Sequence, residues 1–166
     1  KSRFGIGSVS IVADRGMVSA ETLAEVEKRE WKYILGVRMR SSKEAKAVVA
    51  RAGRYAEVYP KSDDRDDPSP LKVKEVWVED KRRYVVCVNE DQAKKDRLDR
   101  EAVVASLRVA LGKGDKALVG NKGYRKFLQD GGKKFSVDED KIQEEARYDG
   151  KWVLTTNMDL PTREVA

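Results

Sequence analysis

The sequence has no histidine, a single cysteine and no long apolar run, and each of these absences excludes a class of chemistry. Cys87 is the only cysteine among 166 residues. A Ser-His-Asp triad, a Cys-His dyad and a histidine-based zinc site all need an imidazole, and an internal disulfide needs a second thiol. No run approaches the ~18 apolar residues of a membrane helix, and no secretory signal opens the sequence. We therefore expect a cytoplasmic protein without a membrane partner, whose ionic chemistry uses Asp, Glu, Lys, Arg or Tyr.

Charged residues are unusually frequent in the chain. Charged residues make up 39% of the sequence, compared with about 25% in an average protein. The hydrophobic fraction of 40% is still enough for a folded core, and the length fits one domain with or without a subdomain. The formal net charge is +6. Disorder of the whole chain is therefore not expected.

Two tracts each carry a large excess of positive charge. Residues 38–61 and residues 112–134 each hold seven Lys or Arg and two Asp or Glu, which gives +5 in both cases. Basic tracts of this kind favour a polyanionic partner, and nucleic acid is the simplest one. The alternative is a solvated surface that charge keeps soluble.

The first forty residues have the pattern of a βαβ unit. A β-rich run over 8–13 is followed by a turn at 14–17, and Ser19 has the position of a helix N-cap. Apolar residues at helical spacing predict a helix to residue 30, and 33–37 reads as a second buried strand. We expect these strands to be parallel in a helix-covered sheet.

The remaining elements are assigned from caps, turns and periodicity. The stripe formed by Leu98, Ala102, Ala105 and Val109 is expected to be the buried face of a long helix. Three aromatic residues are expected in the core, and the alternative is that they stack on nucleic-acid bases: Trp77, Tyr124 and Trp152. Cys87 is expected to be a buried, inert thiol. The expected elements are a helix over 43–52, a loop over 60–70, a hairpin of 71–78 with 84–88, a helix over 90–111, a short helix near 124–128, a helix capped by Ser136 and a strand over 152–156.

Asp14 is the residue most suggestive of a site. It lies where a strand gives way to a loop, and sites of parallel α/β sheets gather at the carboxyl ends of strands. A carboxylate there could hold a divalent metal. The alternative is a turn aspartate that bonds to its own backbone.

Two segments near the ends of the chain resemble a known family. SVSIVADRGMVS (8–19), followed by YILGV (33–37), resembles the second-aspartate block of DDE transposases of bacterial insertion sequences. ARYDGKWVLTTN (146–157) resembles the block that precedes their catalytic-glutamate helix. RYVVCVNE (83–90) and LVGNKGYR (118–125) resemble the insertion between the two blocks. The resemblance thus covers nearly the whole chain.

The resemblance implies an α/β fold with a partial ribonuclease-H-like core, a βαβ unit around Asp14, and a mixed α+β insertion region. Such enzymes cut DNA and join the freed 3′-hydroxyl to a target, using two Asp, one Glu and two Mg²⁺ or Mn²⁺ ions. Asp14 is then the second catalytic aspartate and a metal ligand. Arg15 would contact a phosphate or an active-site carboxylate, and the alternative is a surface ion pair. Lys122 and Arg125 of the second basic tract would meet the DNA backbone, and the alternative is solvated charge. The parent is expected to act on DNA as a homo-oligomer.

Two of the three carboxylates have no counterpart here. The strand of the first aspartate belongs before Lys1, and none of the six tyrosines begins the Tyr-x-x-Arg motif of the glutamate helix. We therefore expect an inactive internal fragment with no bound metal: core at 1–54, insertion at 55–147 and a return strand at 148–166. The alternatives are a nucleic-acid-binding α/β module without chemistry and a degenerate transposase remnant.

Overall fold

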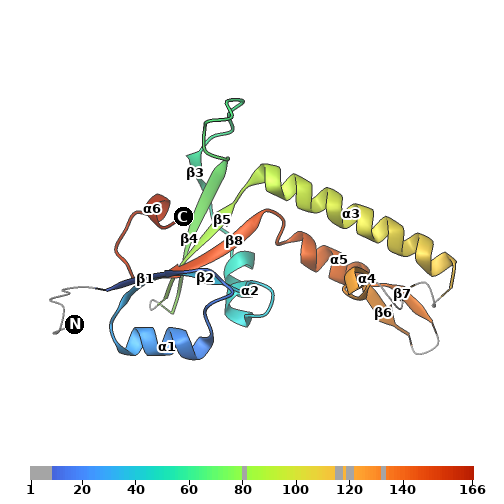
Figure 1. Cartoon of the computed structure of the whole chain (residues 1–166), viewed down its shortest axis with the longest axis horizontal. Coiled ribbons are helices and arrows are strands. Elements are labelled where there is room, and N and C mark those ends of the chain that lie inside the picture. Colours follow the sequence, from blue (N-terminus) through green and yellow to red (C-terminus); the bar gives the residue numbers. More distant parts are fainter. Residues whose placement is uncertain (1–8, 80–81, 115–117, 119–121, 132–133) are drawn as a thin grey trace. The chain divides into compact units, whose positions relative to one another are not determined.

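The computed structural model describes residues 9–79, 82–114, 118, 122–131 and 134–166. These residues form eight strands and six helices, labelled in Figure 1. The chain divides into two compact units, one formed by Lys1–Asn89 with Lys151–Ala166 and the other by Glu90–Gly150. The fold is mixed α/β, and its main sheet is mostly antiparallel.

A six-stranded sheet forms the first unit. Its order is β1-β2-β8-β5-β4-β3; only β1 and β2 are parallel, and the other neighbours are antiparallel. β5 is buried on both faces, which marks it as a central strand. The strands are β1 (Ser10–Ala13), β2 (Lys32–Val37), β3 (Ala56–Tyr59), β4 (Leu71–Val78), β5 (Arg82–Val88) and β8 (Lys151–Thr156).

The predicted βαβ unit is confirmed. Helix α1 (Ala20–Lys28) begins after Ser19, whose hydroxyl accepts a hydrogen bond from the Thr22 N–H at 3.1 Å. Val26 packs with Tyr33 and Leu35 of β2, so α1 covers that face of the sheet. Connecting the two parallel strands by a helix gives the β1-α1-β2 crossover that the apolar spacing predicts.

A second helix covers the same face further along the sheet. Helix α2 (Lys43–Ala50) begins after Ser42, whose hydroxyl accepts from the Ala45 N–H at 3.2 Å. Its buried residues are Ala45, Val48 and Val49. The predicted loop over 60–70 and the hairpin of β4 with β5 are also confirmed. Residues 56–88 fall in the expected insertion region, yet they supply three strands of this sheet.

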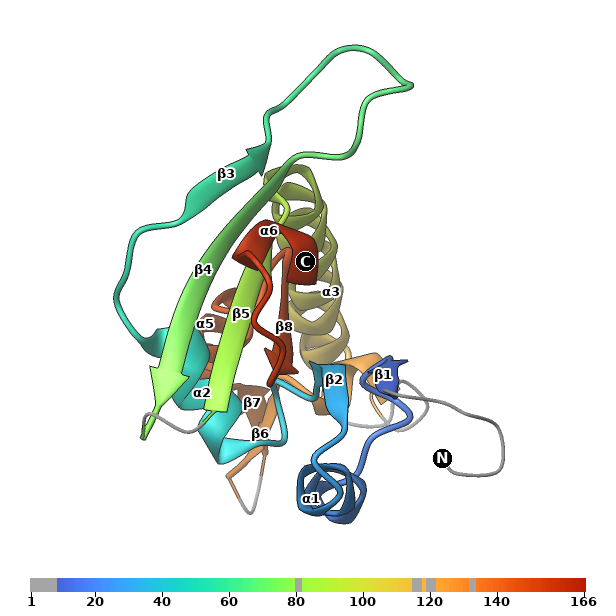
Figure 2. The same ribbon diagram turned by 90° about the vertical axis from the view of Figure 1, so that its left-hand side faces the viewer.

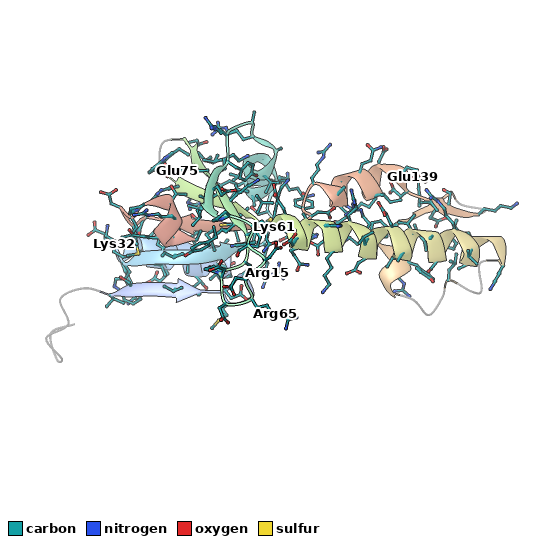
Figure 3. The ribbon with its side chains drawn as sticks, turned by 90° about the horizontal axis from the view of Figure 1, so that it is seen from above. Arg15, Lys32, Lys61, Arg65, Glu75 and Glu139 are labelled. Carbon is teal, nitrogen blue, oxygen red and sulfur yellow. The ribbon has the colours of Figure 1, made fainter. Side chains whose placement is uncertain are left out.

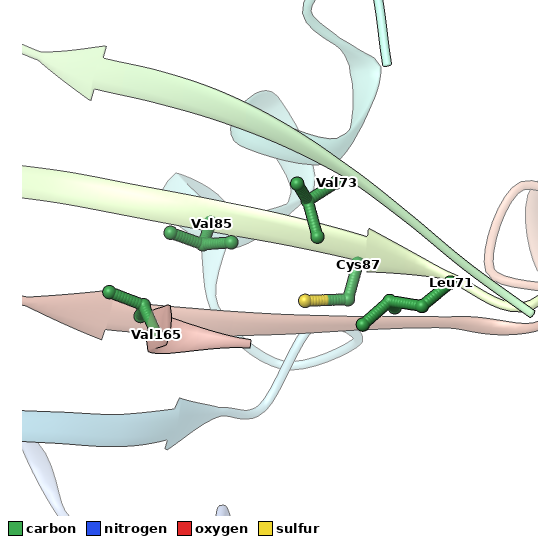
Figure 4. Packing of buried hydrophobic residues seen from close by; sticks show 5 residues of the cluster. All are labelled: Leu71, Val73, Val85, Cys87 and Val165. Atoms are coloured by element: carbon green, nitrogen blue, oxygen red, sulfur yellow. The ribbon is translucent and has the colours of Figure 1, made fainter. Parts of the chain in front are cut away.

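The opposite face carries its own core. Leu71, Val73, Val85 and Cys87 pack with Val165 of the short helix α6 (Thr162–Val165) (Figure 4). Figure 2 shows α6 lying over β5 and β8. Cys87 is buried, as expected, and burial raises the pKa of its thiol to about 12.

The second unit begins where β5 ends and returns to β8. It comprises α3 (Glu90–Gly112), α4 (Lys122–Arg125), β6 (Leu128–Asp130), β7 (Phe135–Val137) and α5 (Glu139–Ala146), with β6 and β7 antiparallel. Val104, Leu107, Leu118 and Phe127 form its core. Because Val88 pairs with Lys151, the chain leaves and rejoins the sheet at neighbouring positions.

The face of α3 predicted to be buried is exposed. Leu98 is 51% exposed and Val109 60%, and Ala102 and Ala105 between them are exposed as well. The helix has a second apolar stripe, and that one packs in the core of the unit through Val103, Val104, Leu107, Ala110 and Leu111. Periodicity identified the helix but could not choose between its two apolar stripes.

Two smaller predictions are also wrong. Asp138, not Ser136, caps α5: its carboxylate accepts from the Lys141 N–H at 2.8 Å, while Ser136 lies in β7. Trp77 is 47% exposed rather than in the core, and its indole N–H donates to Glu75 Oε1 at 2.6 Å. Tyr124 and Trp152 are half-buried against apolar clusters.

Among the residues described, no helix combines the length and apolarity needed to cross a bilayer.

Candidate functional site at the end of β1

Asp14 directly follows the last residue of β1. Ala13 pairs with Leu35 in the parallel register, so Asp14 stands at the carboxyl ends of β1 and β2. This is the edge at which open α/β sheets place their sites. The side chain of Asp14 is exposed, and so is that of Arg15, which Figure 3 labels. Solvent therefore reaches the carboxylate.

A tight turn fixes the direction of this carboxylate. The Arg15 N–H donates to Asp14 Oδ1 at 2.6 Å, and the Met17 N–H donates to the Asp14 carbonyl at 2.9 Å. The first bond is the local backbone contact expected of a turn aspartate. This bond uses the Oδ1 atom of the carboxylate, so the Oδ2 atom is the one that a metal ion would bind.

Arg38, just after β2, holds the turn from the other side. Its Nε donates to the Arg15 carbonyl at 3.1 Å and its Nη2 to the Gly16 carbonyl at 3.3 Å. A guanidinium can serve two carbonyls at once because its donors form a rigid planar fork. Arg38 belongs to the first basic tract, and here it acts within the fold.

Gly36 makes the close approach of the turn possible. A Cβ atom on this residue would lie 2.6 Å from the Arg15 backbone nitrogen. Real Cβ atoms essentially never come so close, so a side chain here would push the turn away from β2. Neither Gly36 nor Arg38 stood out in the sequence, since their role depends on a contact between segments more than twenty residues apart.

The Thr-Thr-Asn end of the second resembling segment holds β2 in place. Thr156 Oγ1 donates to the Tyr33 carbonyl at 2.6 Å. The Asn157 side chain accepts from the Tyr33 N–H at 3.0 Å and donates to the Trp31 carbonyl at 2.9 Å. Asn157 therefore continues the β2–β8 pairing with its side chain, one residue beyond the end of β8.

The Tyr-Asp-Gly part of the same segment belongs to the second unit. Asp149 and Arg100 form an ion pair, with side chains 16% and 12% exposed. The Gly150 N–H donates to Asp96 Oδ2 at 2.8 Å, and Gly150 has a φ of 61°, a conformation that favours glycine. This segment thus ties the end of the second unit to α3.

The other predicted nucleic-acid contacts lie in the second unit. Lys122 and Arg125 begin and end α4, and the Arg125 side chain is exposed. The charge around them is partly used inside the unit, since Lys126 forms an ion pair with the buried Glu145. Arg15 belongs to the first unit, so the predicted DNA contacts are divided between two bodies.

A metal site for two ions does not fit the described residues. No group of three or more His, Cys, Asp or Glu side chains in the described ranges is arranged to hold a metal ion. Two Mg²⁺ ions need several oxygen ligands, and Asp14 supplies one carboxylate at this edge. The described residues therefore do not form a complete two-metal centre.

The structure also contains an acidic pocket that the sequence did not indicate. Its volume is about 600 Å³, and Arg82 at its wall pairs with Glu27 of α1 at 2.9 Å and Glu44 of α2 at 3.5 Å. The hydrogen bonds from Arg82 lower the pKa of Glu27, although burial opposes this. Arg82 thus ties both helices to β5. The remaining lining residues are Glu30, Lys32, Tyr33, Val78, Glu79 and Asn157.

Comparison of the chain with protein-family models, with curated proteins and with solved structures found no match.

Proposed function

We propose that this chain supplies the second catalytic aspartate of a DDE transposase, a metal-dependent enzyme that cuts DNA strands and joins them to a target. The observation that carries the proposal is the place of Asp14. It follows β1 at the carboxyl ends of two parallel strands, exposed and in a turn fixed by Gly36 and Arg38. A carboxylate held in a constant position on a rigid sheet suits metal-dependent phosphoryl transfer.

The two resembling segments lie next to each other in the sheet, and this supports the proposal. Residues 33–37 lie in β2 and residues 151–156 form β8, and these strands pair with each other. Segments more than one hundred residues apart in the sequence therefore meet in one sheet, and β2 also pairs with β1, the strand that precedes Asp14. The contacts of Thr156 and Asn157 with β2 give these motif residues a physical role.

A ribonuclease-H-like core would add a strand at the outer edge of β1. Within the described residues that edge is unpaired, and Val12 on β1 is 76% exposed. An unpaired strand edge readily accepts another strand. We propose that the strand bearing the first aspartate pairs there, which would bring its carboxylate beside Asp14.

In this proposal the chain supplies and positions one carboxylate of the two-metal centre and does not complete that centre. Asp14 presents one carboxylate, and Arg38 and Gly36 keep its turn on β2. Arg15, Lys122 and Arg125 are proposed to meet the DNA backbone, which would make binding salt-dependent. By itself the chain is proposed to be inactive.

The test uses the product of the complete reading frame. Its neighbouring sequence should contain an aspartate-bearing strand before this chain and a glutamate-bearing helix after it. Asp14→Asn keeps the bond from the Arg15 N–H, so folding should be preserved while DNA cleavage in Mg²⁺ falls at least ~1000-fold (roughly 4 kcal/mol of barrier). The matched control is Asp159→Asn, which removes another exposed carboxylate of the same unit and should cleave like the parent protein.

Two results would contradict the proposal. One is a reading frame without the other two carboxylates, and the other is full cleavage by Asp14→Asn. DNA binding without cleavage by the complete product would instead support the nucleic-acid-binding module.

DNA contacts of the second unit are tested separately. The double variant Lys122→Ala with Arg125→Ala should weaken binding of this chain to duplex DNA and reduce the slope of log K against log salt by about 2. The control double variant, Lys28→Ala with Arg163→Ala, removes the same charge from the first unit. It should change the slope of log K against log salt less than the α4 variant does. Equal effects of both pairs would indicate a diffuse charge effect and no contact at α4.

A further inference from the structure

Helix α3 carries an apolar stripe that its own unit does not use. Leu98, Ala102, Ala105 and Val109 follow one another at intervals of four, three and four residues, and all four are exposed. Those intervals are the a/d spacing of a coiled coil, in which a stripe of this kind is covered by another helix. A contiguous apolar patch on a solvent face often marks an interaction site.

The opposite side of α3 is the one that packs inside the unit. Leu107 is fully buried, Val104 is 5% exposed, and Arg100 pairs with Asp149. In the heptad these side chains occupy the c and f positions, which normally face solvent. The a and d positions, which normally face a partner helix, are exposed here. The helix therefore has two apolar faces, one packed in the core of its own unit and one exposed.

We propose that the stripe on α3 binds the same stripe of a second copy of this chain, with the two helices antiparallel. Ala102 would lie against Ala105 of the second copy, and Leu98 against Val109, with each contact made twice by the two-fold axis. Small residues at the centre let the two backbones approach closely, and the larger side chains close both ends.

Charge complementarity selects the second copy and the antiparallel direction. Glu101 and Arg108 flank the stripe on one side, at the positions that meet across an antiparallel pair. Each Glu101 then faces Arg108 of the second copy, which gives two opposite-charge pairs. A parallel pair would instead place Lys95 against Lys95 at an a position.

The present partners of these two residues are easily exchanged. Arg108 lies 2.8 Å from Glu139 with side chains 57% and 60% exposed, and Glu101 lies 3.8 Å from Arg97. Exposed pairs contribute little to stability, so turning toward a second copy costs little. Since four residues per copy bury less than a standard interface, the dimer should be weak, with a Kd of roughly micromolar order.

A charge-swap experiment tests the pairing. Sedimentation equilibrium of this chain should show a concentration-dependent dimer. Glu101→Arg and Arg108→Glu should each weaken the dimer at least ~10-fold, because each homodimer then contains like charges. An equimolar mixture of the two variants should regain the original affinity, since both pairs are again opposite. A mixture that stays monomeric would overturn the proposal.

Cysteine cross-linking tests the direction. Leu98→Cys and Val109→Cys, mixed and oxidised, should give a disulfide-linked dimer, whereas Leu98→Cys alone should not, because its two copies would lie about 16 Å apart along the helices. Cys87 is buried and does not compete. Cross-linking of Leu98→Cys with itself would indicate a parallel pair and overturn the proposed arrangement. A chain that remains monomeric at all concentrations would show that no second copy binds the stripe.

Discussion

A methyl group on Gly36 would lie 2.6 Å from the backbone nitrogen of Arg15, so the turn that carries Asp14 rests directly on β2. The contact joins residues that are twenty-one positions apart, and Arg38 closes the same contact from outside through the Arg15 and Gly16 carbonyls. The direction of the Asp14 carboxylate is thus set by the strand next to its own.

Gly36→Ala should therefore destabilise the protein and displace the turn. Backbone atoms cannot yield as a flexible side chain would, and overpacking of this kind costs about 1–3 kcal/mol in the free energy of unfolding. Urea denaturation measures that loss, and amide chemical shifts of residues 14–17 report the displacement. The matched control is Gly16→Ala in the same turn, because a Cβ there meets nothing within 4 Å. Equal stability of the two variants would contradict the close packing.

Asn157→Ala should loosen the start of β2. The change removes the acceptor for the Tyr33 N–H and the donor for the Trp31 carbonyl, and losing a partly exposed hydrogen bond costs about 1 kcal/mol in the free energy of unfolding. Asn157→Asp keeps the acceptor and loses the donor, so its loss in the free energy of unfolding should be smaller. Hydrogen exchange at the Tyr33 amide should rise in the alanine variant and much less in the aspartate variant. The reverse order would contradict this role.

Acid should weaken the bond that holds α1 to β5. The hydrogen bonds from Arg82 keep the pKa of Glu27 below its ordinary value of 4.5 in the folded protein. A lowered folded pKa favours folding when the carboxylate is ionised. The contribution is therefore fully present above the unfolded pKa and is lost as pH falls through the folded one.

Glu27→Gln should accordingly be less stable than the original protein at pH 7, by about 1 kcal/mol or less because the pair is partly exposed. The difference in the free energy of unfolding between Glu27→Gln and the original protein should become smaller between pH 4.5 and pH 3. Arg82→Gln removes the other partner and should show the same narrowing. Urea unfolding at both pH values measures it, and a gap independent of pH would contradict the assignment.

Local signals in the sequence predicted the elements around Asp14 well. Ser19 caps the helix expected to follow it, a helix forms within the predicted range 43–52, and the run at 71–78 forms its strand. These features depend on a few neighbouring residues, which is why periodicity and capping chemistry suffice to find them.

Features that depend on distant contacts were not predicted. The choice between two apolar stripes on α3 is made by Phe127 and Leu118, which pack against one of them. The capping-box spacing of Ser136 and Glu139 predicts Ser136 as the cap of α5, but Ser136 pairs with Gln129 between β6 and β7, and Asp138 caps the helix instead. The support of the Asp14 turn by Gly36 and Arg38 has no local signature at all.

The most direct test of the central proposal is metal rescue at Asp14. In the product of the complete reading frame, Asp14→Cys replaces a carboxylate by a thiolate, which binds Mg²⁺ poorly and accepts Mn²⁺ more readily. Cys87 is buried with a raised pKa and does not interfere. We predict that DNA cleavage by this variant is lost in Mg²⁺ and partly restored in Mn²⁺, while Asp14→Ala stays inactive in both. Cleavage by Asp14→Ala in Mg²⁺ at the original rate would contradict the assignment of Asp14 as a metal ligand.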